Sequence, residues 1–295
     1  MREFNRDDAQ LMAASEILPG ESRDLSRILA NHGTLREAEN QLALSDSHEL
    51  IEFLYLNLDV GRIEYWEKQL NRLRTDRPRA WMVTSAESDY PANLKAAYDH
   101  PPFLFVDGSL ESGDVNALSI AGSRAASNQG CQAAREIGQT AAREGITVVS
   151  GLARGIDAAA HEGALSAGGR TIAVLGHGIT RLYPKQHENL AERIRTSGCL
   201  MSQFRPDSPP TGSTFPMRNT VISGLSCASL IVEANERSGT RVEADAALRQ
   251  GRYVILWEPL LGGQSWARRY SFNVGVHWAS TMQEVLKLVQ AEPVN

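Results

Sequence analysis

Four segments of the chain combine small residues with hydroxyl groups or arginines, residue types that suit the binding of an anion. They are GSR at Gly122–Arg124, SGLARGID at Ser150–Asp157, FPMRN at Phe215–Asn219 and SGT at Ser238–Thr240. Glycine lets backbone N–H groups approach an anion closely, and guanidinium groups bind phosphate through paired hydrogen bonds. Each glycine could instead serve only as a tight turn between a strand and a helix. Because four such segments occur and three carry an arginine, the sequence favours an anion site.

Other chemistries lack a motif. The chain has no G-x-x-x-x-G-K-[ST] loop and no G-x-G-x-x-G after its first glycine-rich turn, which argues against ATP hydrolysis and dinucleotide redox chemistry. Asp157 and His161 are spaced by four residues and could orient an imidazole or hold a metal, but no third ligand stands at a recognisable spacing. We therefore predict Asp157 as a helix N-cap and His161 as a packed side chain, and we expect no metal, no cofactor and no nucleophilic triad.

Composition indicates a soluble globular protein of about two domains. The chain has 295 residues, of which 42% are hydrophobic and 22% are charged. The net charge of −5 argues against a protein that coats duplex DNA with its whole surface, although 26 of the 30 basic residues are arginines. The three cysteines are widely spaced, and neither an apolar leader nor a membrane-length apolar run is present. These features predict reduced thiols, a cytoplasmic location and no membrane partner.

The first part of the chain is predicted to be helical. Residues 1–79 show apolar side chains at spacings of three and four and are predicted to form a small helical domain. Its helices are expected at Arg23–Asn31, Leu35–Ala43, His48–Asn57 and Val60–Arg74.

From residue 80 to residue 295, short apolar strands alternate with helices. Strands are expected at Ala80–Thr84, Phe103–Val106, Leu118–Ala121, Thr147–Ser150, Thr171–Leu175, Cys199–Ser202, Leu230–Glu233 and Tyr253–Leu256. Helices are expected at Pro91–Tyr98, Asn128–Glu144, Ala158–Ser166, Gln186–Thr196, Arg218–Ser226 and Val242–Gln250. This alternation predicts a doubly wound parallel α/β sheet with its core at about residues 116–257. The anion-binding segments follow the strands, where such sheets bind their ligands.

The segments also carry a family resemblance. GSRAAS at Gly122–Ser127, SGLARGIDAAAH at Ser150–His161, TIAVLGHG at Thr171–Gly178, FPMRN at Phe215–Asn219 and IVEANERSGT at Ile231–Thr240 resemble the DNA-processing protein A (DprA/Smf) family, in order and over roughly Tyr90–Arg252. The resemblance implies an extended Rossmann-like domain after a small helical domain. It further implies a homodimer that binds single-stranded DNA without enzymatic turnover and passes the strand to a RecA-type recombinase.

By the same resemblance, the DNA phosphates lie at the strand ends, and Arg124 and Arg218 are expected at loop ends rather than in the core. The implied DNA- and phosphate-binding residues are Gly122, Ser123, Arg124, Ser127, Ser150, Gly151, Arg154, Gly155, Phe215, Arg218, Asn219, Gly239 and Thr240.

Departures from the family pattern suggest a divergent member. The chain reads RNTVISGLS where the family usually reads RNRIIAGLS, so Thr220 stands in place of a second arginine. It also ends soon after the predicted sheet, which predicts the absence of the winged-helix-like C-terminal domain that many members carry. These differences suggest a task in mobile-element or phage-defence biology rather than in natural transformation.

One departure supports an alternative function. Gly239–Glu243 forms a GTxxE string, which resembles the phosphoribohydrolases of the lysine-decarboxylase-like LOG family. In that case Arg218 and Glu243 would be catalytic in cleaving a nucleoside monophosphate, or the site would sense a nucleotide. The usual Pro-Gly-Gly lead-in is missing, since Asn235–Ser238 reads NERS. A third class, a protein-interaction partner that uses the helical domain, has no motif behind it. We therefore prefer single-stranded DNA binding.

Overall fold

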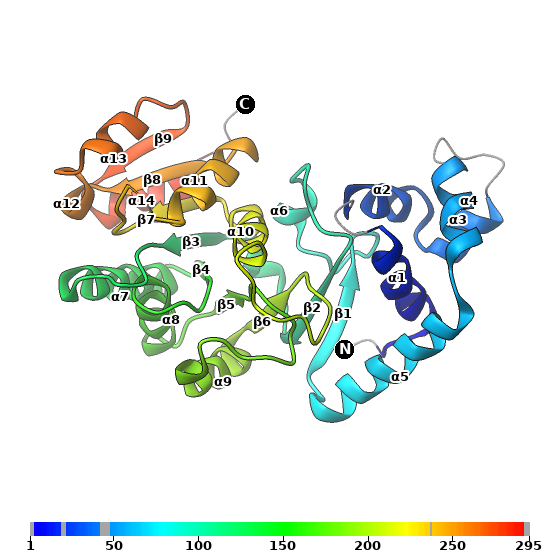
Figure 1. Ribbon diagram of the computed structural model, residues 1–295. Coiled ribbons are helices and arrows are strands. Elements are labelled where there is room, and N and C mark those ends of the chain that lie inside the picture. The colour runs from blue at the N-terminus through cyan, green and yellow to red at the C-terminus, as the bar shows by residue number, and fades with distance from the viewer. Residues whose placement is uncertain (1–2, 19–21, 42–47, 237, 292–295) are drawn as a thin grey trace.

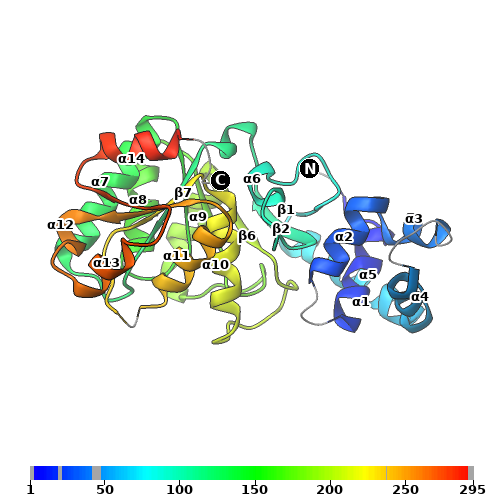
Figure 2. The same ribbon diagram turned by 90° about the horizontal axis from the view of Figure 1, so that it is seen from above.

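A nine-stranded sheet with helices on both faces forms the centre of the protein, and a group of helices from the N-terminal part packs beside one end of it (Figures 1 and 2). The computed structural model describes residues 3–18, 22–41, 48–236 and 238–291. Within these residues, no helix is both long and apolar enough to cross a membrane.

The elements have the following bounds. The strands are β1 (Ala80–Thr84), β2 (Phe103–Gly108), β3 (Ala117–Ala121), β4 (Thr147–Ser150), β5 (Thr171–Val174), β6 (Cys199–Ser202), β7 (Ala228–Ile231), β8 (Tyr253–Trp257) and β9 (Val276–Ala279). The helices are α1 (Arg6–Ile17), α2 (Ser22–His32), α3 (Leu35–Asn40), α4 (His48–Asn57), α5 (Val60–Asp76), α6 (Ala92–Lys95), α7 (Asn128–Arg143), α8 (Ile156–Ser166), α9 (Glu188–Ser197), α10 (Thr214–Leu225), α11 (Thr240–Arg249), α12 (Glu258–Leu261), α13 (Ser265–Tyr270) and α14 (Met282–Val289). Short 3-10 helices occupy Ser112–Val115 (η2) and Lys185–His187 (η3).

The strand order is β1-β2-β6-β5-β4-β3-β7-β8-β9, and every neighbouring pair from β6 to β9 is parallel. After β3 the chain first builds outward through β4, β5 and β6, and then returns through α10 to place β7 on the other side of β3. The strand order therefore switches at β3, whose two neighbours in the sheet are β4 and β7. A ligand of such a sheet binds outside the carboxyl ends of these strands.

Two parts of the sheet differ from the predicted all-parallel arrangement. Strands β1 and β2 pair antiparallel with each other, and β2 pairs antiparallel with β6. A parallel neighbour needs a crossover that covers one face of the sheet, and α6 is a single turn, so the chain doubles back instead. The sheet also continues past residue 257, because β9 adds a further parallel strand beside β8.

Alternating side chains along the strands divide the core between the two faces of the sheet. On β3, Leu118 and Ile120 pack with apolar side chains of α7, α8 and α14. Ala121, on the opposite face, packs with Ala244 and Ala247 of α11 and with residues of α13. Strands β4, β5 and β7 are buried on both faces, so their sequences are nearly continuously apolar.

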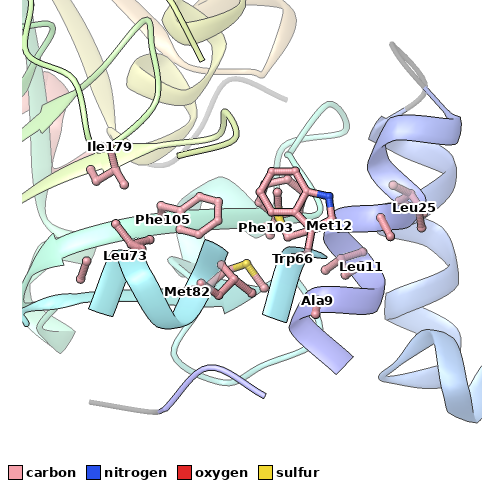
Figure 3. Packing of buried hydrophobic residues seen from close by; sticks show 14 of the residues in the cluster. Ala9, Leu11, Met12, Leu25, Trp66, Leu73, Met82, Phe103, Phe105 and Ile179 are labelled. Atoms are coloured by element: carbon pink, nitrogen blue, oxygen red, sulfur yellow. The ribbon is translucent and has the colours of Figure 1, made fainter. Parts of the chain in front are cut away.

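The N-terminal helices share a core with the sheet. Met12 of α1 and Trp66 of α5 belong to one buried cluster with Met82 of β1 and with Phe103 and Phe105 of β2 (Figure 3). Helix α1 was not predicted from the sequence. Its buried side chains surround most of the helix instead of forming one apolar stripe, so a periodicity of three and four residues is weak there.

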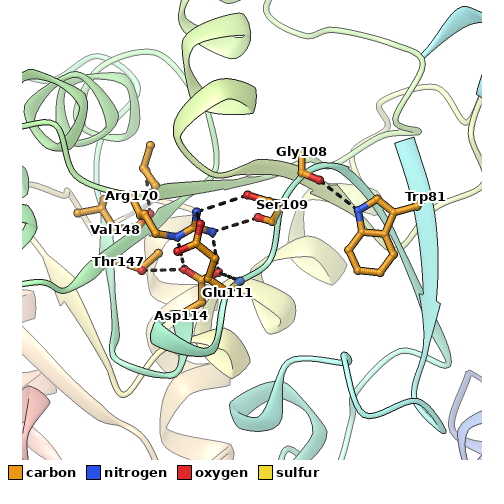
Figure 4. A network of polar contacts seen from close by, with 9 residues as sticks. Trp81, Gly108, Ser109, Glu111, Asp114, Thr147, Val148 and Arg170 are labelled. Carbon is orange, nitrogen blue, oxygen red and sulfur yellow. Dashed lines mark hydrogen bonds and ion pairs between the residues drawn. The ribbon is translucent and has the colours of Figure 1, made fainter. Parts of the chain in front are cut away.

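A charged network holds the amino ends of the parallel strands, on the edge of the sheet opposite the switch point. Arg170 donates to Asp114 from Nε at 2.9 Å and from Nη2 at 2.8 Å, and it also pairs with Glu111 (Figure 4). Thr147 donates to Asp114 at 2.9 Å. The arginine is thus fully engaged in joining η2 to the sheet, and this edge is stabilised by fixed ion pairs.

Candidate functional site

A cavity of about 630 Å³ opens at the carboxyl ends of β3, β4 and β7, where the strand order switches. It is lined by Ala121, Gly122, Ser123, Arg124, Ala125, Ala153, Asp157, Gly212, Phe215, Pro216, Arg218, Asn219, Asn235, Ser238, Gly239, Thr240, Val242 and Glu243. Its walls come from the loops after β3 and β7, from the start of α8, and from the first turns of α10 and α11. The volume lies within the range of small-ligand sites.

The outer wall of this cavity carries one exposed cation on an aromatic ring. The guanidinium of Arg124 lies 4.8 Å from the centre of the Phe215 ring, in a cation–π contact. Tyr183, which is half exposed, lies beside the same ring at 6.1 Å between centroids. A Cβ atom on Gly176 would come within 2.6 Å of the Phe215 ring, so the glycine makes room for it. A phosphate and a base can both be accommodated here, the first by the guanidinium and the second by the rings.

Arg218 forms part of the inner wall of the cavity and lies in the core, so its expected position at a loop end is wrong. Helix α10 begins at Thr214, not at Arg218, and this places the side chain in the second turn with only 5% of its surface exposed. Its Nη1 donates to the carbonyl of Val174 at 3.0 Å, while its Nε has no acceptor among the described residues. A Cβ atom on Gly151 would lie 1.5 Å from Nη1, so Gly151 supplies the space for this arginine.

Two buried carboxyl groups lie near Arg218 in the cavity wall. Asp157 accepts hydrogen bonds from the backbone of Ala153 and Gly151, and burial raises its pKa although Arg218 opposes the shift. Glu243 accepts a hydrogen bond from Ser119 Oγ at 3.2 Å. Burial, together with the nearby Asp157, raises the pKa of Glu243 to about 8. At neutral pH Glu243 is therefore mostly uncharged.

No ion pair within 4 Å joins Arg218 to either carboxyl group in the part of the chain that the structure describes. Burial lowers the pKa of Arg218, and the charge of Asp157 is the main opposing influence. A buried guanidinium with an unpartnered Nε and no contacting carboxylate is a group that an incoming anion would stabilise.

The N-terminus of α7, by contrast, already holds an anion of the protein itself. Glu233, which follows β7, accepts hydrogen bonds from the Ser127 backbone N–H at 3.0 Å and from the Ser127 hydroxyl at 2.6 Å. Its own carbonyl accepts from the backbone N–H of Ser123 at 2.7 Å. The backbone donors that the family resemblance assigned to DNA near Ser123 and Ser127 are therefore engaged within the protein.

The remaining predicted residues lie outside the cavity wall. Ser150 is buried and donates to the carbonyl of Ile120 at 2.6 Å. Gly155 has a φ of +76°, and a Cβ atom there would come within 2.3 Å of the Ser123 carbonyl, so it supports the turn before α8. Arg154 is exposed next to this turn. The structure thus brings together Gly122, Ser123, Arg124, Phe215, Arg218, Asn219, Gly239, Thr240 and Glu243, and it leaves Ser127, Ser150, Gly151, Arg154 and Gly155 around them.

Asp157 and His161 also differ from their predicted setting. Gly155 is the N-cap of α8, and Asp157 lies in the first turn, so the prediction of Asp157 as N-cap is wrong. His161 is fully buried, as predicted, with its Nδ1 2.7 Å from Thr171 Oγ1, and burial lowers its pKa to about 3. Across the described residues, no three His, Cys, Asp or Glu side chains come together as a metal site requires.

Sequence reasoning assigned Asp157 another role, that of a helix N-cap, and assigned no role to Glu233. Glu233 had a visible signal, since it lies two residues after a buried strand at the edge where ligands bind. Asp157 belongs to the SGLARGID segment that was predicted to contribute to an anion site, but its place beside Arg218 depends on the depth at which the arginine lies.

Comparison with known proteins places these features in a family. The family model described as DNA recombination-mediator protein A matches residues 81–289. Protein Smf of Escherichia coli is 40% identical over 204 residues, which take in 69% of this chain and 53% of that protein, so the chain spans about half of its length. The DNA processing protein DprA of Bacillus subtilis is 32% identical over 260 residues, 86% of this chain and 84% of the relative.

Solved structures agree with this comparison. The crystal structure of DNA processing protein A from Streptococcus pneumoniae superimposes with a TM-score of 0.72 at 26% identity, covering 99% of this chain and all of the other. A structure of DNA processing protein A from Helicobacter pylori, described for its single-stranded DNA binding mode, has the same fold. Its TM-score is 0.62 at 20% identity, with 71% of this chain and 94% of that chain covered.

Proposed function

The chain belongs to the DNA recombination-mediator protein A family, that of the DprA/Smf proteins, and we propose that it binds single-stranded DNA in the cavity at the switch point of its sheet. The Arg124–Phe215 pair carries this proposal. A phosphate binds the exposed guanidinium, and an unstacked base binds against the exposed part of the aromatic ring. A single strand can present both groups at once, whereas a duplex keeps its bases stacked and paired.

The finer features of the proposal come from the family resemblance. In it the protein acts without turnover, forms a homodimer and cooperates with a RecA-type recombinase in the cytoplasm. The helical residues 1–79 and the residues 80–295 are its two domains.

The alternative, cleavage of a nucleoside monophosphate, is not favoured. That chemistry needs a charged carboxylate to stabilise the positive charge that develops on the ribose. Glu243 has a pKa raised to about 8 by its burial, so at neutral pH the group is mostly uncharged. The family assignment points in the same direction.

We expect a clear preference for single-stranded over blunt duplex DNA in a fluorescence anisotropy titration. The described wall of the cavity carries two arginines, so we expect about two contacts to phosphate. The logarithm of the binding constant should then fall with the logarithm of salt concentration with a slope of about −1.4, at about −0.7 per phosphate. Equal affinity for the duplex, or no dependence on salt, would contradict the proposal.

Replacing Arg124 with alanine should weaken single-strand binding about ten- to a hundredfold, because it removes a charged hydrogen bond to phosphate worth about 1.5–3 kcal/mol. The thermal midpoint should stay nearly unchanged, since the side chain is exposed. Arg143→Ala is the matched control, because Arg143 is an exposed arginine at the far end of α7. Equal losses in the two variants would indicate general electrostatic attraction and not a site at Arg124.

A further inference from the structure

A second, smaller cavity lies on the other side of the loop that follows β7. Its volume is about 230 Å³, and its wall consists of Glu236, Arg241, Trp266, Arg269, Tyr270 and Asn273. The loop and the start of α11 separate it from the cavity at the switch point. Asn235 and Val242 line the first cavity, while their chain neighbours Glu236 and Arg241 line the second. Adjacent Cα atoms are about 3.8 Å apart, so the two cavities share one thin wall.

Unused hydrogen-bond donors are concentrated at this second cavity. The indole N–H of Trp266 is buried without an acceptor among the described residues, and only 5% of the side chain is exposed. The Nε of Arg241 is likewise buried without an acceptor. A buried N–H that lacks an acceptor destabilises a fold, and an anion that accepts from it removes this cost.

The acceptors and hydroxyl groups near the cavity are already engaged. Glu236 pairs with Arg269 at 2.7 Å, the Tyr270 hydroxyl donates to Asp245 at 2.8 Å, and the Asn273 amide donates to the carbonyl of Tyr270 at 2.8 Å. The Glu236–Arg269 pair is 61% and 63% exposed, so it contributes little and can be replaced by an incoming anion. Among the described residues of the wall there are two guanidinium groups and one carboxylate, and the carboxylate of Asp245 lies next to Tyr270, from whose hydroxyl it accepts.

We propose that this cavity is a second phosphate subsite, which binds the DNA backbone where the strand leaves the switch-point cavity. The proposal rests on single-strand binding at the first cavity. Arg241, Arg269 and the Trp266 N–H donate to the phosphate oxygens. The bound strand then carries one phosphate at the Asn235 and Val242 side and another at the Glu236 and Arg241 side.

Strand length tests this arrangement. An oligothymidylate of about 3 nucleotides occupies the first cavity alone, and one of about 20 nucleotides reaches both. Arg241→Ala and Arg269→Ala should each lower the affinity for the longer oligonucleotide about fivefold or more. Each should also make the slope of the logarithm of its binding constant against the logarithm of salt concentration less negative by about 0.7. Neither variant should alter the affinity for the short one. Arg268→Ala, which removes an exposed arginine of the same helix that lies outside the cavity wall, is the matched control and should leave both affinities unchanged.

Trp266→Phe provides an independent measurement, because it removes the N–H and keeps most of the apolar surface. We expect weaker binding of the longer oligonucleotide with an equal or higher thermal midpoint, since an unsatisfied donor is lost. A lower midpoint with unchanged affinity would show a purely structural tryptophan and overturn its part in the subsite.

The outcomes separate this proposal from the one on which it rests. If the wild type binds both oligonucleotides and the Arg241 and Arg269 variants behave like Arg268→Ala, the second subsite is wrong and the first cavity stands. If those variants lose affinity for the short and the long oligonucleotide equally, the arginines act on the whole protein and the second subsite is wrong. If the wild type binds neither oligonucleotide, both proposals fail.

Discussion

Replacing Arg218 with alanine is expected to lower the free energy of unfolding by about 1.5–3 kcal/mol, the usual contribution of a hydrogen bond made by a charged group. The side chain is 5% exposed and is held by the carbonyl of Val174. Its loss leaves a cavity and removes the charge that opposes the upward shift in the pKa of Asp157. Chemical denaturation at neutral pH, followed by circular dichroism, measures the change.

Two further variants show whether the loss of stability in Arg218→Ala comes from the missing charge or from the buried position of the side chain. Arg218→Lys keeps the charge and loses the planar fork, so it should recover part of the stability. Arg124→Ala, at the exposed rim of the same cavity, should change the free energy of unfolding by less than about 0.5 kcal/mol. A stable Arg218→Ala protein that has lost only DNA affinity would mean that Arg218 is an accessible phosphate ligand and not a core residue.

Glu243→Gln should make the protein less sensitive to alkaline pH. The pKa of Glu243 rises from about 4.5 in an unfolded chain to about 8 in the folded protein, because burial disfavours its charged form. The folded state therefore binds more protons than the unfolded state between these values, and stability falls as pH rises through that window. At pH 9 the glutamine variant should be more stable than the wild type, by on the order of 4 kcal/mol. At pH 5 the two should be similar.

Thermal midpoints of both proteins at several pH values give this comparison, and effects of the histidines cancel because both proteins contain them. Single-strand binding at pH 7 should be unchanged or slightly tighter in the variant. A constant difference in midpoint across the pH range would show that Glu243 is ionised in the folded protein. Release of free base from a nucleoside monophosphate by the wild type, lost in the variant, would restore the phosphoribohydrolase alternative.

The parallel part of the sheet could be predicted closely from the sequence because each of its strands is short, apolar and bounded by glycine or polar turns. The bounds of β4 and β6 agree with the prediction to the residue. The edges could not be predicted, because the antiparallel pairing of β1 and β2 depends on which neighbour each strand meets. The same holds for β9, where His277 and Trp278 interrupt the buried pattern at the sheet edge.

The types of residue that line the cavity could be predicted from the sequence, but how deeply each side chain is buried could not. Arg124 and Phe215 lie together at the rim, as an anion site with an aromatic group requires. Arg218 was placed too far outward because the predicted α10 began after Pro216. Proline is tolerated in the first turn of a helix, so Pro216 is compatible with the observed start at Thr214. Four residues of additional helix place Arg218 in the core.

The position of Glu233 has a consequence for competition by free nucleotides. In sheets of this kind, the helix after the first parallel strand is the usual seat of a cofactor pyrophosphate. Here that seat, the N-terminus of α7, is occupied by a carboxylate that Ser127 holds through its backbone and its hydroxyl. A nucleoside diphosphate or triphosphate would have to displace this carboxylate, and its phosphates would gain no net charge stabilisation in the exchange. This occupied helix N-terminus disfavours nucleotide binding at α7, so we expect free nucleotides to compete poorly with single-stranded DNA for the adjacent cavity.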